Sequence, residues 1–195
     1  MRRDPDSRLL HEATGLLLLG AGALLFLSLV SFEVADVPHW FLLGSDHATR
    51  PVHNFVGRVG VLLAALVYWL MGATGFLLAA LALAYGVVKL VHPGFSVARR
   101  LPWIATFVLS SACMLQIQNS FLHGWARHLR LAGPGGMLGY GVGERLVEPL
   151  FGGIGSLILL GGAYAASLVL LTGIHPVVAL RGSLRLIPAL WTRLA

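Results

Sequence analysis

Four long apolar runs divide this chain, and charged residues gather in the segments between them. The runs cover about residues 13–33, 57–90, 101–122 and 150–174. A membrane-spanning helix needs about 20 predominantly apolar residues, so each run is long enough to cross a bilayer. We therefore predict an all-α integral membrane protein with four transmembrane helices, and we treat residues 1–195 as one membrane domain.

The second run is longer than one crossing requires. At a rise of 1.5 Å per residue, its charge-free stretch 59–88 would form a helix about 45 Å long, against a hydrocarbon core of about 30 Å. Two crossings would move the basic residues that follow it to the opposite side of the membrane. We therefore predict one long helix that tilts or projects beyond the outer face, in which Gly72 and Gly75 mark either a bend or close packing.

Composition and charge support a membrane location and give it a direction. The chain is 57% hydrophobic and only 11% charged, whereas soluble domains carry roughly 25% charged residues. Nine of the 14 Lys and Arg residues lie in the N-terminal tail, in the loop after the second run and in the C-terminal tail. By the positive-inside rule, both termini are predicted to be cytoplasmic, with outer loops at about 34–56 and 123–149.

The second outer loop contains a glycine-rich stretch followed by "ERLVEPLF". Gly135, Gly139 and Gly143 recur every four residues, so a helix here would present one bare stripe. We interpret the segment as a short amphipathic helix on the outer surface before the last span. A mobile glycine-rich loop is the alternative, and the sequence leaves both open.

The spans carry few groups that could do chemistry. No GxxxxGK[ST] sequence occurs, so the chain has no P-loop for ATP. No charge and no histidine falls in the middle of a span, which argues against an ion pump and against a haem between helices. A lone cysteine, Cys113, excludes an internal disulfide. We predict no catalytic, cofactor-binding or metal-binding residue and no cofactor.

One alternative function rests on polar residues in the third run. Ser110, Ser111, Gln116, Gln118 and Asn119 cluster toward its outer half. They are the only candidates for a polar pathway among the spans, so a small transporter or pore is the alternative reading.

The stretch "RPVHNFVGRVG" at the start of the second run is unusually polar. Asn54 is a candidate N-cap whose side chain accepts an early helix N–H. Gly57 and Gly60 lack side chains, so another backbone could approach the first turns of this helix. A polar loop that simply ends in a helix is the alternative.

Three pieces of sequence resemble the N-terminal four-span membrane domain of FtsK/SpoIIIE-type bacterial DNA translocases. They are "SFEVADVP" after the first run, "PVHNFVGRVG" before the second, and the glycine-rich approach to the last run. Three positions depart from the family pattern: Val37 separates the aspartate from Pro38, Val61 replaces an alanine, and Ala65 replaces a frequent aspartate. The positions that the resemblance marks as structural and assembly residues are Ser31, Asp36, Pro51, His53, Asn54, Gly57, Gly60, Gly72, Gly135, Gly136, Gly139 and Gly155.

The resemblance implies a membrane anchor for a motor that this chain does not contain. In that family the anchor is joined to a cytoplasmic hexameric ATPase that pumps double-stranded DNA at the division septum. We accordingly expect no ATP hydrolysis by this segment and contact with DNA only through the absent motor. The expected partners are the lipid bilayer, further copies of the chain (a hexamer in the family) and other membrane proteins of the septum in the bacterial inner membrane.

Overall fold

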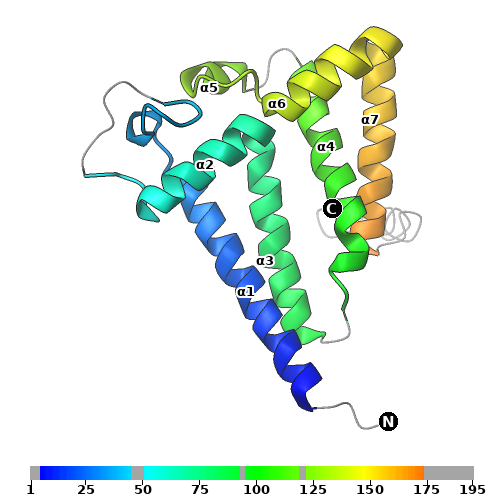
Figure 1. Cartoon of the computed structure of the whole chain (residues 1–195). Coiled ribbons are helices and arrows are strands. Elements are labelled where there is room, and N and C mark those ends of the chain that lie inside the picture. Colours follow the sequence, from blue (N-terminus) through cyan, green and yellow to red (C-terminus); the bar gives the residue numbers. More distant parts are fainter. Residues whose placement is uncertain (1–4, 45–50, 93–94, 119–121, 174–195) are drawn as a thin grey trace, which may run out of the picture.

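The computed structural model describes residues 5–44, 51–92, 95–118 and 122–173, and this part of the chain is helical, with no strand (Figure 1). Four stretches in it are long and apolar enough to cross a membrane. They are Leu9–Val30, Gly57–Val91, Ala98–Ile117 and Gly136–Thr172. The prediction of an all-α protein with four membrane-spanning helices is therefore confirmed. The C-terminal tail after residue 173 lies outside the described residues.

The long helices form two antiparallel pairs. Helix α1 (Pro5–Val30) packs along α3 (Gly75–Val91), and α4 (Leu101–Ile117) packs along α7 (Glu148–Thr172). Figure 1 shows that α1 and α4 begin at the same end of the molecule at which α3 and α7 finish. We call this the base end. Helix α4 ends at Ile117, and residues 119–121 lie outside the described residues.

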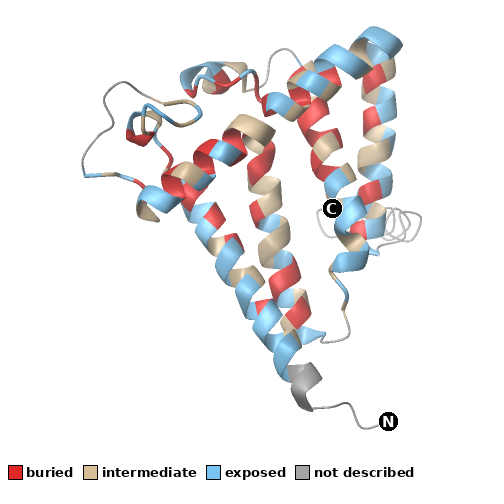
Figure 2. Ribbon diagram, viewed as in Figure 1, coloured by how far each residue is buried: buried red, intermediate tan, exposed pale blue. Residues whose placement is uncertain are grey.

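Glycines let α1 and α3 approach closely. A Cβ added at Gly86 would lie 2.8 Å from the backbone nitrogen of Leu19, and one at Gly22 would lie 2.9 Å from that of Leu83. Large apolar side chains cover the outward faces instead, such as Leu17 with 72% of its surface exposed and Ile154 with 79%. Figure 2 shows this division between buried inner and exposed outer faces. Exposed apolar faces on long helices are what a lipid environment accommodates.

A sharp bend resolves the excess length of the second run. Helix α2 (Gly57–Met71) is separated from α3 by a 3₁₀ turn, η2 (Gly72–Thr74). Helix α2 runs across the end of α1 and meets α3 at an angle (Figure 1). The second run is therefore two helices joined by a turn rather than one continuous helix, and of the two alternatives for Gly72 the bend is confirmed.

The glycine-rich segment is helical rather than a loop. After a short helix α5 (His123–His128), the chain forms α6 (Gly136–Leu138), a π-helix η4 (Gly139–Val147) and then α7, which is kinked at Gly152. Helices α2, α5 and α6 and the π-helix η4 lie at the end opposite the base (Figure 1). We call α2, α5, α6 and η4 the cap, and their end the cap end.

Candidate functional site

The structure brings the two polar motifs of the first connection together at the cap end. Asp36 lies in a 3₁₀ turn, η1 (Val34–Asp36), with a fully buried side chain. Its Oδ2 accepts the backbone N–H of His53 at 2.8 Å, and its Oδ1 lies 3.2 Å from His53 Nδ1. The sequence separates these residues by 17 positions, so the buried carboxylate fixes the path of the connection between α1 and α2.

Asn54 closes the same connection from the inside. Its buried side-chain amide donates to the carbonyl oxygens of Ser28 at 2.9 Å and Ser31 at 3.2 Å, at the end of α1. Its Oδ1 accepts the N–H of Val56 at 3.0 Å, and the Ser31 hydroxyl accepts the N–H of Phe55 at 3.0 Å. The last carbonyl groups of a helix have no N–H partner within that helix. Here the Asn54 amide is the donor for two of the carbonyl groups at the end of α1.

The predicted N-cap role describes only one of the contacts of the Asn54 side chain. The N-cap residue of α2 is Val56, whose own side chain makes no capping bond, and Asn54 Oδ1 accepts the N–H of Val56 just before the first helical residue. Asn54 also satisfies carbonyls at the C-terminal end of α1, where the Tyr68 hydroxyl donates to the carbonyl oxygen of Leu29 at 2.8 Å. Sequence reasoning missed Tyr68, although a lone hydroxyl within an apolar run is a usable signal, because a buried phenol needs a partner.

The two glycines of this motif are needed for different reasons. A Cβ at Gly60 would overlap Asn54 Oδ1 and would lie 2.9 Å from the Ser28 hydroxyl, so this position allows α2 to press against α1. Gly57 has open space around it but adopts φ +67°, which side chains with a Cβ disfavour. Pro51 is exposed at the start of the segment. We call Ser31, Asp36, His53, Asn54 and Gly60 the α1–α2 joint.

A second cluster lies where the bend after α2 meets the glycine-rich segment. The N–H of Ala73 donates to the carbonyl oxygen of Pro134 at 2.9 Å. A Cβ at Gly72 would lie 2.7 Å from the nitrogen of Gly136, and one at Gly136 would lie 2.8 Å from the carbonyl oxygen of Leu70. Two backbones therefore touch here without intervening side chains.

The predicted bare stripe continues this contact onto α4. A Cβ at Gly139 would lie 2.6 Å from the carbonyl oxygen of Ala112, and one at Gly135 would overlap the same atom. We call Gly72, Gly135, Gly136 and Gly139 the bend joint. Gly155 belongs to neither joint, because an added Cβ there would meet only Phe151 of its own helix, at 3.3 Å.

Three of the five polar residues proposed for a pore form hydrogen bonds within the protein. Gln116 is buried; its Nε2 donates to Glu144 at 2.8 Å, and its Oε1 accepts the N–H of Gly135 at 3.3 Å. The hydroxyls of Ser110 and Ser111 donate to carbonyls of their own helix. Gln118 is exposed and Asn119 lies outside the described residues. Nothing in this arrangement favours a polar pathway.

One group near the α1–α2 joint has the composition of a metal site. Glu33, Asp36 and His53 each offer one ligand atom, and these atoms lie within 4.8 Å of one another. Glu33 and His53 are each 57% exposed, and their closest atoms are 3.6 Å apart. The hydrogen bonds between Asp36 and His53 already account for the geometry. We therefore interpret the group as part of the joint.

Comparison with known proteins agrees with this architecture. Residues 7–183 match the family model described as the 4TM region of DNA translocase FtsK/SpoIIIE. Two curated relatives, each named DNA translocase FtsK, come from Leptospira interrogans serogroup Icterohaemorrhagiae, serovars copenhageni (strain Fiocruz L1-130) and Lai (strain 56601). Each is 29% identical over 160 residues, which is 82% of this chain and 15% of the relative. No solved structure matches the chain.

These matches settle what kind of segment this is. The chain spans only about 15% of the length of its curated relatives. The family model describes a membrane region and not an ATPase motor, which confirms that this segment is not the enzymatic part of a translocase. Since that model covers most of its length, the chain belongs to the family of four-transmembrane regions of the FtsK/SpoIIIE DNA translocases.

Proposed function

We propose that this chain tethers a DNA-translocating motor to the inner membrane at the division septum and assembles its copies into a ring. The supporting observation is that α1 begins and α7 finishes at the base end (Figure 1). A domain attached after α7 would leave from the same side as the N-terminal tail. The excess of basic residues favours the cytoplasm for that side.

The cap end supports a role in assembly. It holds the α1–α2 joint and the bend joint, which fix how α2, α6 and η4 lie against the long helices. A surface held in one arrangement loses little entropy when it binds another copy or a septal membrane protein. The motif residues would then serve assembly by fixing the cap, without touching a partner themselves.

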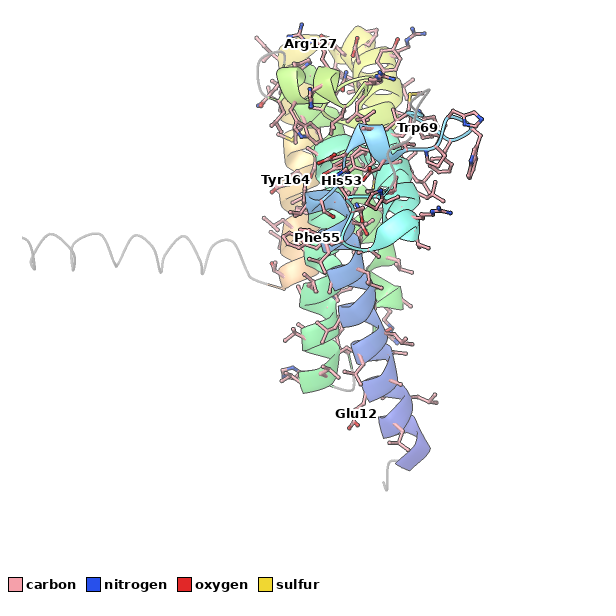
Figure 3. The ribbon with its side chains drawn as sticks, turned by 90° about the vertical axis from the view of Figure 1, so that its left-hand side faces the viewer. Glu12, His53, Phe55, Trp69, Arg127 and Tyr164 are labelled. Carbon is pink, nitrogen blue, oxygen red and sulfur yellow. The ribbon has the colours of Figure 1, made fainter. Side chains whose placement is uncertain are left out.

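The orientation is tested by labelling single cysteines. Figure 3 shows Arg127 at the cap end and Glu12 near the base. In a Cys113→Ala background, we expect a membrane-impermeant maleimide to label Arg127→Cys in intact spheroplasts, and Glu12→Cys only after permeabilisation. The reverse pattern would overturn the proposed orientation.

Localisation and assembly need a separate test. A fluorescent protein fused after residue 195 is expected to gather at the septum in dividing cells, and the chain is expected to be oligomeric in mild detergent. Gly60→Leu should weaken both, because the new side chain would displace Asn54 and the end of α1. Gly124→Leu is the matched control, because Gly124 is exposed in α5 with nothing within 4 Å of an added Cβ. Uniform membrane fluorescence of the unaltered chain would refute the septal role.

A further inference from the structure

A cavity at the base end is independent of both joints. It has a volume of about 610 Å³ and lies between α1 and the segment that leads into α4. Its walls are mostly apolar and include Leu17, Leu18 and Ala21 of α1, together with Val97 and Ala98. Its volume falls within the range of about 300–1,000 Å³ that is usual for small-ligand sites.

One charged side chain enters this apolar cavity. Lys89, in the last turn of α3, is only 8% exposed and lines the cavity. Its Nζ donates to the carbonyl oxygen of Phe95 at 2.7 Å. An ammonium group has three N–H donors, so this bond uses one of them. Within the described ranges, no carboxylate lies within 4.0 Å of Lys89.

The charge on Lys89 is therefore buried without a protein anion in the described part of the chain. Lysine is rarely buried unless it is paired, because burial of an isolated charge is costly. Phe95, whose carbonyl accepts the Lys89 hydrogen bond, is held by two further contacts. Its ring stacks on Tyr85 with centroids 5.5 Å apart, and the Arg100 guanidinium lies 4.7 Å from the centroid of the same ring. Arg100 itself is occupied, since it donates to carbonyls at the end of α7. Lys89 therefore contributes a positive charge to the cavity wall that no described carboxylate offsets.

We propose that this cavity binds an anionic glycerophospholipid, with the phosphate on Lys89 and an acyl chain along the apolar wall of α1. The apolar lining favours a lipid over free phosphate, because phosphate alone would leave those side chains uncovered. Basic pockets between membrane helices recognise anionic headgroups by the same combination. The site would couple the packing of α1, α3 and α4 at the base to the lipid composition of the membrane.

Native mass spectrometry of the purified chain in detergent tests the headgroup. Phosphatidylglycerol and phosphatidylcholine with identical acyl chains are titrated in parallel. We expect phosphatidylglycerol to bind roughly tenfold more tightly, as one charge-assisted contact predicts. Lys89→Gln should remove this preference, since the glutamine amide is polar but carries no charge. Lys89→Arg should retain it, and so should Arg99→Gln, which alters an exposed basic residue outside the cavity.

A second variant tests the acyl chain while leaving the lysine in place. Ala21→Trp would fill the apolar part of the cavity from the exposed face of α1. We expect it to lower phosphatidylglycerol binding at least fivefold. Equal binding of the two lipids by the unaltered chain would overturn the proposal, as would a preference that survives Lys89→Gln. Glycerol 1-phosphate that displaces the lipid at equal concentration would overturn the lipid assignment in favour of a soluble phosphate.

Discussion

Gly72 should be the most sensitive small residue of the cap. Its φ and ψ are +59° and −140°, a region that is essentially closed to residues with a Cβ and costs about 1–3 kcal/mol when imposed on one. In Gly72→Ala the new methyl group would also lie 2.7 Å from the Gly136 nitrogen and would overlap the Pro134 carbonyl. These are backbone atoms and cannot rotate away, and overpacking of this kind typically costs about 1–3 kcal/mol.

The two contributions together predict a loss of about 2–6 kcal/mol in the free energy of unfolding. The measurement is reversible unfolding in mixed micelles as the fraction of denaturing detergent rises, followed by tryptophan fluorescence. Gly162→Ala is the matched control, because Gly162 is exposed within α7 and has nothing within 4 Å of an added Cβ. Alanine is the better helix former by about 1 kcal/mol, so this variant should be as stable as the unaltered chain or slightly more so.

The reasoning about Gly72 has a clear point of failure. If Gly72→Ala unfolds at the same detergent fraction as Gly162→Ala, then the bend is not held by contact between the two backbones. A loss confined to Gly72→Ala, with helix content by circular dichroism retained, would show that the bend joint contributes to the stability of the whole domain.

Two further substitutions probe polar contacts in the same unfolding assay. Asn54→Ala leaves two carbonyl groups at the end of α1 without their side-chain donor, so the free energy of unfolding should fall by about 1–3 kcal/mol. Asn54→Asp keeps the acceptor but loses both donors, so it should be no more stable than Asn54→Ala. Full stability of either variant would refute the role of Asn54 at the end of α1. Gln116→Leu keeps similar volume but removes the bonds to Glu144 and Gly135, so it should cost about 1–2 kcal/mol, whereas Gln118→Leu at an exposed position should be neutral. Equal effects of the two glutamine variants would show that Gln116 is not structural.

The spans were predictable because the bilayer imposes one simple demand. Each crossing must satisfy its backbone groups internally and present about 20 apolar residues, so composition alone finds the four helices. The position of the bend in the second run was predictable as one of two alternatives, but its conformation was not. Gly72 raised the possibility, but its conformation depends on Pro134 and Gly136, which lie more than 60 positions away. No local pattern carries that information.

Asn54 shows why only part of the α1–α2 joint was predictable. Capping preferences are local statistics, and an asparagine just before a helix is most often assigned to that helix. Here the nearest unsatisfied groups belong to the end of the preceding helix, and the close packing of α2 on α1 through Gly60 brings them within reach. A pattern along the chain cannot tell which of two adjacent helix ends an amide will serve until the crossing of those helices is known.

The polar motif residues share a task that explains their position at helix ends. Asn54 serves the carbonyls of α1, while Asp36 and Ser31 each accept a backbone N–H from the segment that leads into α2. Such groups cost several kcal/mol when they are left unsatisfied in a medium without water. A tight connection between two membrane helices must therefore carry its own donors and acceptors. The resulting requirement is for side chains of defined chemistry at a few positions, and it holds whether or not any of them touches a partner, lipid or motor.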